Sequence, residues 1–300
     1  MDYFFEIFLG GMIRGSIYAL IALGYTMVYG IIELINFAHG EIYMIGAFTA
    51  LIAASVFGLL GFSAPVIFIL ALVLAVIYSC CYGFTMEKIA YKPLRSAPRL
   101  SPLISAIGMS LFLQNYVLLA QTSDFLPFPK LIPDLEFMEP YAHIITTQGA
   151  AILVATAVVM ILLSVLIKFT KIGKAMRAAS QDKIMASLSG VNVNRVISIT
   201  FIIGSAAAAI GGLFIASHIG MINFYIGFIA GIKAFVAAVL GGIGSIPGAV
   251  LGSFILGWTE SFATGYVSSD YEDVFAFLLL VLILIFRPAG ILGRKEHKKV

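Results

Sequence analysis

The 300-residue chain is 61% hydrophobic and only 11% charged, with a mean hydropathy of +1.06. Soluble domains carry about 25% charged residues and are about half apolar. A soluble globular fold is therefore excluded, and lipid must be the solvent for most of the chain. The two cysteines are adjacent and the four histidines lie far apart, so the sequence predicts no metal site.

The apolar segments predict about nine membrane-spanning helices. A hydrocarbon layer about 30 Å thick needs about 20 apolar residues per helix. The stretch 226–265 is too long for one span and is interrupted by Gly241-Gly242-Ile243-Gly244-Ser245-Ile246-Pro247-Gly248, where glycine and proline favour a turn. The predicted spans are 9–31, 42–60, 65–86, 101–121, 149–168, 196–218, 226–242, 246–265 and 273–287. We therefore expect an all-α, polytopic transmembrane helix bundle of about 8–10 spans, forming a single domain over residues 1–300.

Basic residues orient this bundle. Fifteen of the 18 Lys and Arg residues lie in three segments, 87–100, 168–195 and 287–299. The segment 122–148 instead holds one lysine and four acids, and 266–273 holds three acids and no base. The positive-inside rule places the three basic segments in the cytoplasm. Nine spans put all three on one side, with the N-terminus outside and the C-terminus cytoplasmic.

A polar run separates the first two predicted spans. It contains Glu33, Asn36, His39 and Glu41, and charge at membrane depth is costly unless it faces a cavity or a partner. Three interpretations stay open: a wet cytoplasmic turn, a broken helix that lines a pathway, or a proton relay. A relay would need further buried acids, for which Glu260 is the candidate.

Further pathway candidates come from the second half of the chain. An interrupted segment in each half of a transporter often marks its pathway, and 36–46 and 241–252 occupy such places. The pathway candidates are therefore Asn36, His39, Glu41, Asn223, Gly241 and Gly242. Arg14 and Lys233 are expected to snorkel to the interface. Glu260, Asn223 and Gln114-Asn115 are expected to join helices. The many small residues in 204–212 and 248–257 indicate either close helix packing or a backbone-lined passage.

The cytoplasmic segment 169–195 predicts contact with another protein. Residues 171–190 combine helix-forming alanines, surrounding bases and apolar positions such as Ile172, Ile184 and Leu188, and Gly190 is a natural helix stop. A simple return loop needs far fewer residues. Exposed apolar groups indicate docking; an interfacial helix on anionic lipid is the alternative.

Nothing in the sequence indicates an enzyme. No G-x-x-x-x-G-K-[ST] motif occurs, and the glycines at 241–244 have no following lysine. We also find no catalytic triad or carboxylate pair. The chain is therefore expected to bind no cofactor, and any ATP that drives it must be used by a separate subunit.

Several motifs resemble the permeases of branched-chain amino-acid ABC importers. They are Gly30-Ile31-Ile32 with Asn36-Phe37-Ala38-His39-Gly40-Glu41; Thr170-x2-Gly173-x3-Arg177-Ala178-x3-Asp182-x3-Ala186-x3-Gly190; Ala238-Val239-Leu240-Gly241-Gly242-Ile243-Gly244-Ser245-Ile246-Pro247-Gly248-Ala249; and Arg287-Pro288-x-Gly290-Ile291-Leu292-Gly293. They cover nearly the entire chain in order. The loop departs from the Glu-Ala-Ala pattern of maltose-type permeases, which favours the larger architecture that resembles vitamin B12 and ribose permeases.

The resemblance implies a set of partners. It implies a heterodimer with a second related permease, two cytoplasmic ATP-binding subunits and a periplasmic amino-acid-binding protein, in a bacterial inner membrane and without nucleic acid. It also implies that Gly173, Arg177, Ala178, Asp182, Ala186 and Gly190 belong to the ATPase-coupling region. The expected substrates are leucine, isoleucine and valine, although related permeases move urea or short amides.

A secondary carrier or channel, and a membrane anchor, are the alternative functions. A stand-alone secondary carrier or channel for a small polar solute would need paired intramembrane charges or a filter motif, and the run 33–41 is the main candidate. A membrane anchor without a pathway fits poorly with so many small-residue spans.

Overall fold

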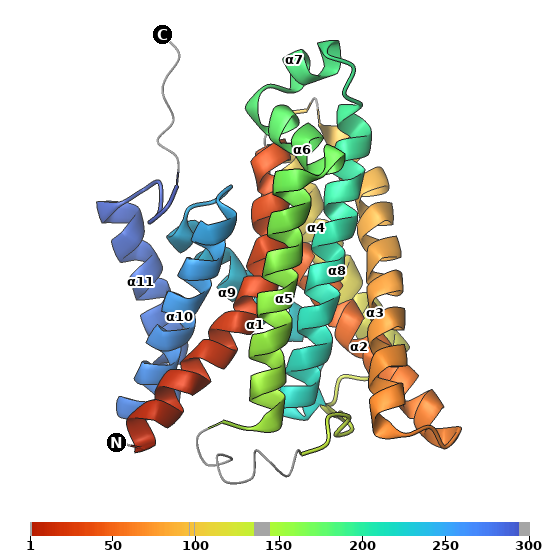
Figure 1. The fold of residues 1–300 in the computed structure, drawn as a ribbon, viewed down its shortest axis with the longest axis vertical. Coiled ribbons are helices and arrows are strands. Elements are labelled where there is room, and N and C mark those ends of the chain that lie inside the picture. The colour runs from red at the N-terminus through yellow and green to blue at the C-terminus, as the bar shows by residue number, and fades with distance from the viewer. Residues whose placement is uncertain (1, 96, 99, 135–144, 294–300) are drawn as a thin grey trace.

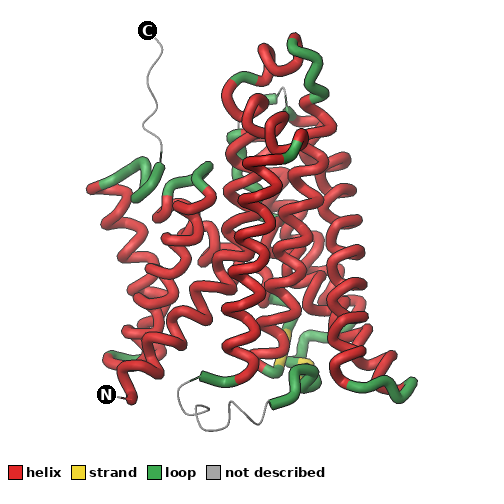
Figure 2. The backbone as a smooth tube through the Cα atoms, in the orientation of Figure 1, coloured by secondary structure: helices red, strands yellow, loops and turns green. Residues whose placement is uncertain are grey.

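The computed structural model describes residues 2–293 except 96, 99 and 135–144. Long helices dominate it, and two short strands lie at one end (Figures 1 and 2). The elements are α1 (Asp2–Ile32), α2 (His39–Leu59), α3 (Ala64–Met86), the π-helical η1 (Glu87–Tyr91), the 3-10 turn η2 (Lys92–Leu94), α4 (Leu100–Ala120), β1 (Leu126–Pro127), α5 (Thr147–Phe169), α6 (Lys171–Gln181), α7 (Lys183–Leu188), α8 (Val193–Ile219), β2 (Met221–Ile222), α9 (Ile226–Gly241), α10 (Ile246–Tyr266), η4 (Ser269–Tyr271) and α11 (Glu272–Phe286).

The all-α bundle is confirmed, but the number of spans is lower than predicted. Among the described residues, six helices are long and apolar enough to cross a membrane, or seven when α9 and α10 count as one bent span. The axes of α9 and α10 differ in direction by 118°. Helices α9 and α11 have 16 and 15 residues, so they extend only about 24 and 22 Å, short of a layer about 30 Å thick. The predicted segments 226–242 and 273–287 match α9 and α11 within one residue, so the sequence located these helices correctly. The prediction of nine spans was too high because it counted these short segments as crossings.

Helix ends follow local signals. The hydroxyl of Thr146 accepts a hydrogen bond from Gly149 N at the start of α5, and Ser245 accepts from Gly248 N at the start of α10. Such caps satisfy amides that the helix leaves free. Gly220, with φ +76°, ends α8 in the left-handed conformation that glycine adopts without strain. Glu33 ends α1 in the same conformation, with φ +61°.

Small residues bring the central helices into contact. This confirms that the small-residue segments 204–212 and 248–257 serve close helix packing. At the crossing of α1 and α10, a Cβ added to Gly257 would lie 2.4 Å from the Gly11 carbonyl oxygen. A Cβ on Gly212 of α8 would lie 2.3 Å from the Tyr43 carbonyl oxygen of α2. Close backbone approach of this kind is how helices associate where lipid removes the hydrophobic driving force. Helices α1, α2 and α8 accordingly form the most buried part of the bundle, whereas α5 is mostly exposed.

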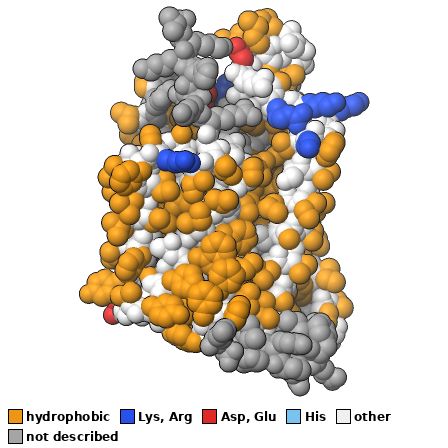
Figure 3. Space-filling view, turned by 60° about the vertical axis from the view of Figure 1, so that its left-hand side comes forward, with side chains coloured by type: hydrophobic (Ala, Val, Ile, Leu, Met, Phe, Trp, Pro, Cys, Tyr) orange, Lys and Arg blue, Asp and Glu red, His pale blue; other side chains and the backbone are white. Residues whose placement is uncertain are grey.

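The described parts of the three basic segments lie at one end of the molecule; of the last segment only Arg287 is a described base. Figure 1 places α6, α7 and the end of α11 at this end, opposite the start of α1. Arg95 donates to Asn194 Oδ1 at 2.5 Å and Lys88 donates to Ser198 Oγ at 3.1 Å, so the segment after α3 lies beside the start of α8. In the space-filling view, apolar side chains cover the middle of the molecule while Lys and Arg lie toward this end (Figure 3).

Candidate functional site

The segment α6–α7 is a helical hairpin shaped by side-chain caps. Thr170 Oγ1 accepts a hydrogen bond from Gly173 N at 3.0 Å. Asp182 ends α6 and starts α7, and its Oδ1 accepts from the amides of Ile184 and Met185 at 2.8 and 3.0 Å. Gly190, with φ +84°, ends the hairpin. The predicted residues Asp182 and Gly190 therefore set its shape.

Three other predicted coupling residues lie on the inner side of the hairpin. A Cβ on Gly173 would lie 2.3 Å from the carbonyl oxygens of both Leu166 and Ile167, so a larger residue would push α6 away from the end of α5. Ala186 is buried, and Ala178 is half-buried. These positions face inward, so they support the hairpin and do not present its surface.

Arg177 binds within the chain. Its guanidinium donates to the carbonyl oxygens of Ile167 and of Lys168, the latter at 3.1 Å. A cation at the C-terminus of α5 stabilises the free carbonyl groups there. Arg177→Glu would therefore disturb the junction of α5 and α6 in addition to any partner contact, which the sequence alone did not indicate.

The hairpin exposes four large apolar side chains among polar and basic ones. Ile184, Met185 and Leu188 are 72%, 61% and 76% exposed, and Ile172 on α6 is also exposed. Exposed apolar groups within a basic surface favour docking onto another protein. The residues most available to a partner are thus the apolar ones, which motif matching did not select.

The hairpin also contacts the break between α1 and α2. Lys183 Nζ donates to the carbonyl oxygen of Ile32, the last residue of α1, at 3.3 Å. Glu33 follows in its left-handed conformation, and its amide donates to Tyr29 O at 2.8 Å. A movement of α7 would therefore act directly on the end of α1.

The polar run after α1 is not a wet turn, because three of its four polar residues are buried. Asn36 and His39 are each 2% exposed and Glu41 is fully buried. The Tyr91 hydroxyl donates to Asn36 Oδ1 at 2.6 Å. Ser110 Oγ and Gln114 Nε2 of α4 each donate to Glu41 Oε1 at 2.8 Å. These bonds tie the start of α2 to η1 and α4.

Close packing surrounds this buried run. A Cβ on Gly24 would lie 2.1 Å from His39 Nε2, and one on Gly40 would lie 2.3 Å from Gly227 O in α9. Asn36 Nδ2, His39 Nε2 and Glu41 Oε2 are buried without a hydrogen-bond partner among the described residues. In this conformation the three side chains line no open passage, and their place in a pathway stays a prediction.

The other pathway candidates lie at the two ends of α9. Asn223 Oδ1 accepts from Tyr225 N at 3.2 Å in the loop before the helix. Gly241 packs against Gly248, where a Cβ would lie 1.8 Å from its carbonyl oxygen. The amides of Ile291 and Leu292 donate to the carbonyl oxygens of Leu240 and Gly241 at 3.0 and 2.9 Å. The motif at 287–293, which follows α11, is therefore hydrogen-bonded to the motif at 238–249. This contact lies at the end of the molecule that carries α6.

Lys233 does not snorkel, because it is buried and binds carboxylates, and the partly exposed Arg14 binds one of the same carboxylates. Lys233 Nζ lies 3.2 Å from Glu260 Oε1, 2.7 Å from Glu272 Oε1 and 2.9 Å from Asp273 Oδ1. Arg14 Nη1 lies 2.8 Å from Glu272 Oε2. The five groups, here called the charge network, join α1, α9, α10 and α11. The sequence missed it because the partners are 27 to more than 250 residues apart.

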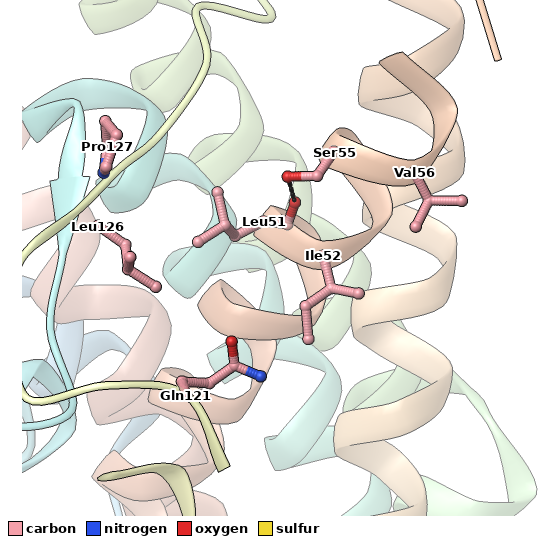
Figure 4. Close-up of a pocket in the computed structure, with 7 residues that line it drawn as sticks. All are labelled: Leu51, Ile52, Ser55, Val56, Gln121, Leu126 and Pro127. Carbon is pink, nitrogen blue, oxygen red and sulfur yellow. Dashed lines mark hydrogen bonds between the residues drawn. The ribbon is translucent and has the colours of Figure 1, made fainter. Parts of the chain in front are cut away.

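A hollow opens at the end opposite α6 and α7. It has a volume of about 320 Å³ and lies between the C-terminal half of α2 and the segment after α4 (Figure 4). The short β1–β2 pair, Leu126 with Ile222 and Pro127 with Met221, holds that segment against the end of α8. The lining residues are Leu51, Ile52, Ser55, Val56, Gln121, Leu126 and Pro127.

Comparison with known proteins decides the family. Residues 7–284 match the family described as the permease component of the branched-chain amino acid transport system. The chain belongs to this family. It is 47% identical to the high-affinity branched-chain amino acid transport system permease protein LivH of Escherichia coli K12, over 99% of this chain and 98% of LivH. It is 49% identical to BraD of Pseudomonas aeruginosa, which carries the same description, over 97% and 96% of the two chains.

A solved structure supports the fold of this permease. A metal-chelate type ABC transporter in an inward-facing conformation matches with a TM-score of 0.50 and 15% identity, over 93% of this chain and 84% of that one. The resemblance to branched-chain amino-acid permeases, predicted from four motifs, is confirmed over nearly the full length. Membership of this permease family, together with the six or seven candidate spans among the described residues, makes this chain a multi-pass membrane protein.

Proposed function

We propose that the chain is a membrane-spanning permease subunit of an ATP-driven importer that moves leucine, isoleucine and valine into the cytoplasm. The observation that carries this proposal is its 47–49% identity, over almost its entire length, to permeases described as high-affinity branched-chain amino acid transport proteins. The fold agrees, because it combines a small-residue helix bundle with a helical hairpin at its basic end.

The hairpin is the part that would receive force from separate ATP-binding subunits. Its exposed apolar residues Ile184, Met185 and Leu188 form a surface for a groove on a partner. Its inner side is bound to α5 through Arg177 and to α1 through Lys183. A push on the hairpin would therefore reach the buried run at the start of α2.

The proposed orientation follows from charge. The end with α6, α7 and the end of α11 carries most of the described bases, and the opposite loop carries Asp124 and Asp134 with Lys130. The positive-inside rule then favours an outside N-terminus and a cytoplasmic C-terminus. With Cys80 and Cys81 replaced by alanine, single cysteines at Ser123 and Ser187 test this with a membrane-impermeant thiol reagent in intact cells, where Ser123→Cys should react and Ser187→Cys should not.

Labelled leucine uptake tests the function. Proteoliposomes would contain this chain with its presumed second permease, ATP-binding subunits and binding protein. Uptake that requires ATP and every partner, and that isoleucine or valine competes, is the expected result. Uptake by this chain alone without ATP would favour a secondary carrier or channel instead. An assembled complex that hydrolyses ATP but carries urea or amides, and no leucine, would overturn the substrate.

A further inference from the structure

The junction between α5 and α6 carries three lysines, here called the lysine cluster. Lys168 lies in the last turn of α5, and Lys171 and Lys174 lie near the start of α6; all three are exposed. Their ammonium groups make no ion pair within the described residues. Between Glu139 and Asp182 the sequence has four bases and no acid. The positive charge of this cluster is therefore left for a partner of opposite sign.

Helix geometry gathers these charges on one side of the junction. Lys171, Lys174 and Arg177 recur every three residues along α6, so they share one face of the helix. The buried residues of α6 lie on the opposite face; they are Gly173, Met176 and Ala179. Arg177 donates to the carbonyl oxygens of Ile167 and Lys168 at the end of α5. The basic face of α6 therefore lies beside Lys168.

The exposed side of α5 shows what surrounds the cluster. With 23 residues α5 is about 35 Å long, close to a hydrocarbon thickness of about 30 Å, so Lys168 lies where hydrocarbon meets headgroups. It is the least buried of the six candidate spans in the described part of the chain. Large apolar side chains form an exposed stripe along it; they are Val154, Val158, Ile161, Leu162, Val165 and Phe169. Small residues join the helices of this bundle, whereas a stripe of large apolar side chains suits lipid, and the cluster begins where this stripe ends.

A ring beside a lysine marks the same boundary. The Lys168 ammonium lies 5.5 Å from the centre of the Phe169 ring, which is 67% exposed. At the end of a span, a long basic side chain keeps its apolar stem with the hydrocarbon and extends its charge to the headgroups. The space-filling view likewise shows Lys and Arg side chains beyond the apolar middle of the molecule, toward the basic end (Figure 3).

We propose that the lysine cluster binds the phosphate groups of anionic phospholipids in the leaflet at the basic end of the molecule. Basic segments next to a span attract anionic lipid, and each lysine near such a surface strengthens the association about fivefold. Lys168 belongs to α5 and the other two lysines to α6, so the bound lipid contacts both helices at their junction. This site goes beyond the proposed function, because it does not depend on the transported substrate.

The position of the cluster favours lipid over an ATP-binding subunit. The proposed dock for that subunit is on α7, through the apolar side chains of Ile184, Met185 and Leu188. Helix α6 has 11 residues and is about 16 Å long. The cluster lies at its start and α7 follows its end, so the two surfaces are at opposite ends of α6. The cluster instead continues the lipid-facing side of α5.

Photolabelling by lipids tests the site in the full chain. Phosphatidylcholine nanodiscs would contain a small share of phosphatidylglycerol with a diazirine in its acyl chain, or of phosphatidylcholine with the same label. Mass spectrometry of the digested chain then counts lipid adducts on the half of α5 next to Lys168. Labelled phosphatidylglycerol should give at least about fivefold more adducts there than labelled phosphatidylcholine. Equal labelling by the two lipids would overturn the proposal.

Charge-matched variants separate a site from general attraction. Lys168→Gln, Lys171→Gln and Lys174→Gln together should remove the preference for phosphatidylglycerol, whereas arginine at the same three positions should keep it. The control replaces three other exposed bases at the same end and should also keep it: Lys92→Gln, Arg195→Gln and Arg287→Gln. All these side chains are exposed, so each variant should unfold as the wild type does.

Three results would refute the lipid site. One is a preference that survives the glutamine variant of the cluster. Another is an equal loss in the control variant, which would mean attraction by net charge alone. The third is reduced co-purification of ATP-binding subunits by the cluster variant at an unchanged lipid preference, which would assign the cluster to that subunit.

Discussion

Removal of the Lys233 ammonium gives a stringent test of the charge network. Lys233 lies within 3.2 Å of three carboxylates, and its side chain is 11% exposed while that of Glu260 is fully buried. Lys233→Met keeps the length and apolar stem of the side chain but removes its charge. Glu260 would then be left buried with the Tyr18 hydroxyl, 2.7 Å away, as its remaining described partner.

The expected loss of unfolding free energy in Lys233→Met follows from the burial of its partners. Removing one member of a buried ion pair destabilises a protein by about 3–5 kcal/mol, because the other charge is left unpaired. Asp273, whose side chain is 63% exposed, should contribute little, since exposed pairs are worth about 0–1 kcal/mol. Lys233→Met should therefore lower the free energy of unfolding by about 3 kcal/mol or more, with Glu260 as the main cause.

The protein carries its own reporter for this measurement. Trp258 is the only tryptophan in the sequence; its ring stacks on Phe8 at 5.1 Å and its Nε1 donates to Phe8 O at 3.2 Å. Its fluorescence in detergent micelles should follow separation of α10 from α1 during denaturant unfolding. The matched control is Lys130→Met, which breaks a pair whose side chains are 58% and 62% exposed.

A double-mutant cycle identifies the cause. Lys233→Met with Glu260→Gln removes both charges, so it should recover at least about 1 kcal/mol of the loss caused by Lys233→Met alone, within the range for coupled neighbours. If Lys233→Met matches Lys130→Met, or if Glu260→Gln brings no recovery, then the network is not a stabilising unit and our account of Lys233 is wrong.

Three further predictions address other parts of the molecule. Glu33→Gly should raise the free energy of unfolding by about 1 kcal/mol, because glycine adopts the observed φ of +61° without a Cβ penalty; Glu33→Val, measured in the same unfolding assay, should lower it, and equal values for the two would contradict the strain argument. Glu41→Ala should destabilise by about 2 kcal/mol or more, since it leaves the buried donors of Ser110 and Gln114 unpaired; Glu41→Gln keeps an acceptor oxygen, so a loss as large as that of alanine would argue against these bonds. Ile184→Asp and Leu188→Asp should abolish co-purification of the ATP-binding subunits at unchanged chain stability, whereas Ser187→Asp on the same short helix should not; retention of those subunits by the two apolar-site variants would exclude this surface as the dock.

Composition and local chemistry determined much of this protein in advance. The apolar content required a membrane protein, because no soluble core accommodates so few charges. The segment boundaries followed from helix-stop and capping residues that act within a few positions, such as Thr170, Asp182 and Gly190. The distribution of bases predicted that three distant segments share one end. The four motifs predicted the family, which full-length similarity confirms.

Tertiary structure alone decided which polar groups meet. Lys233 and Arg14 looked like snorkelling residues because their carboxylate partners lie on helices that the sequence cannot place beside them. Gln114 and Asn115 are neighbours in sequence, but successive residues of a helix point about 100° apart around its axis. Gln114 is therefore buried and hydrogen-bonded to Glu41, whereas Asn115 is exposed. The number of spans also depended on tertiary structure, since the sequence located α9 and α10 but did not show that their axes differ by 118°. Burial and pairing of charges in a bundle are properties of helix contacts, and those contacts join residues far apart in the chain.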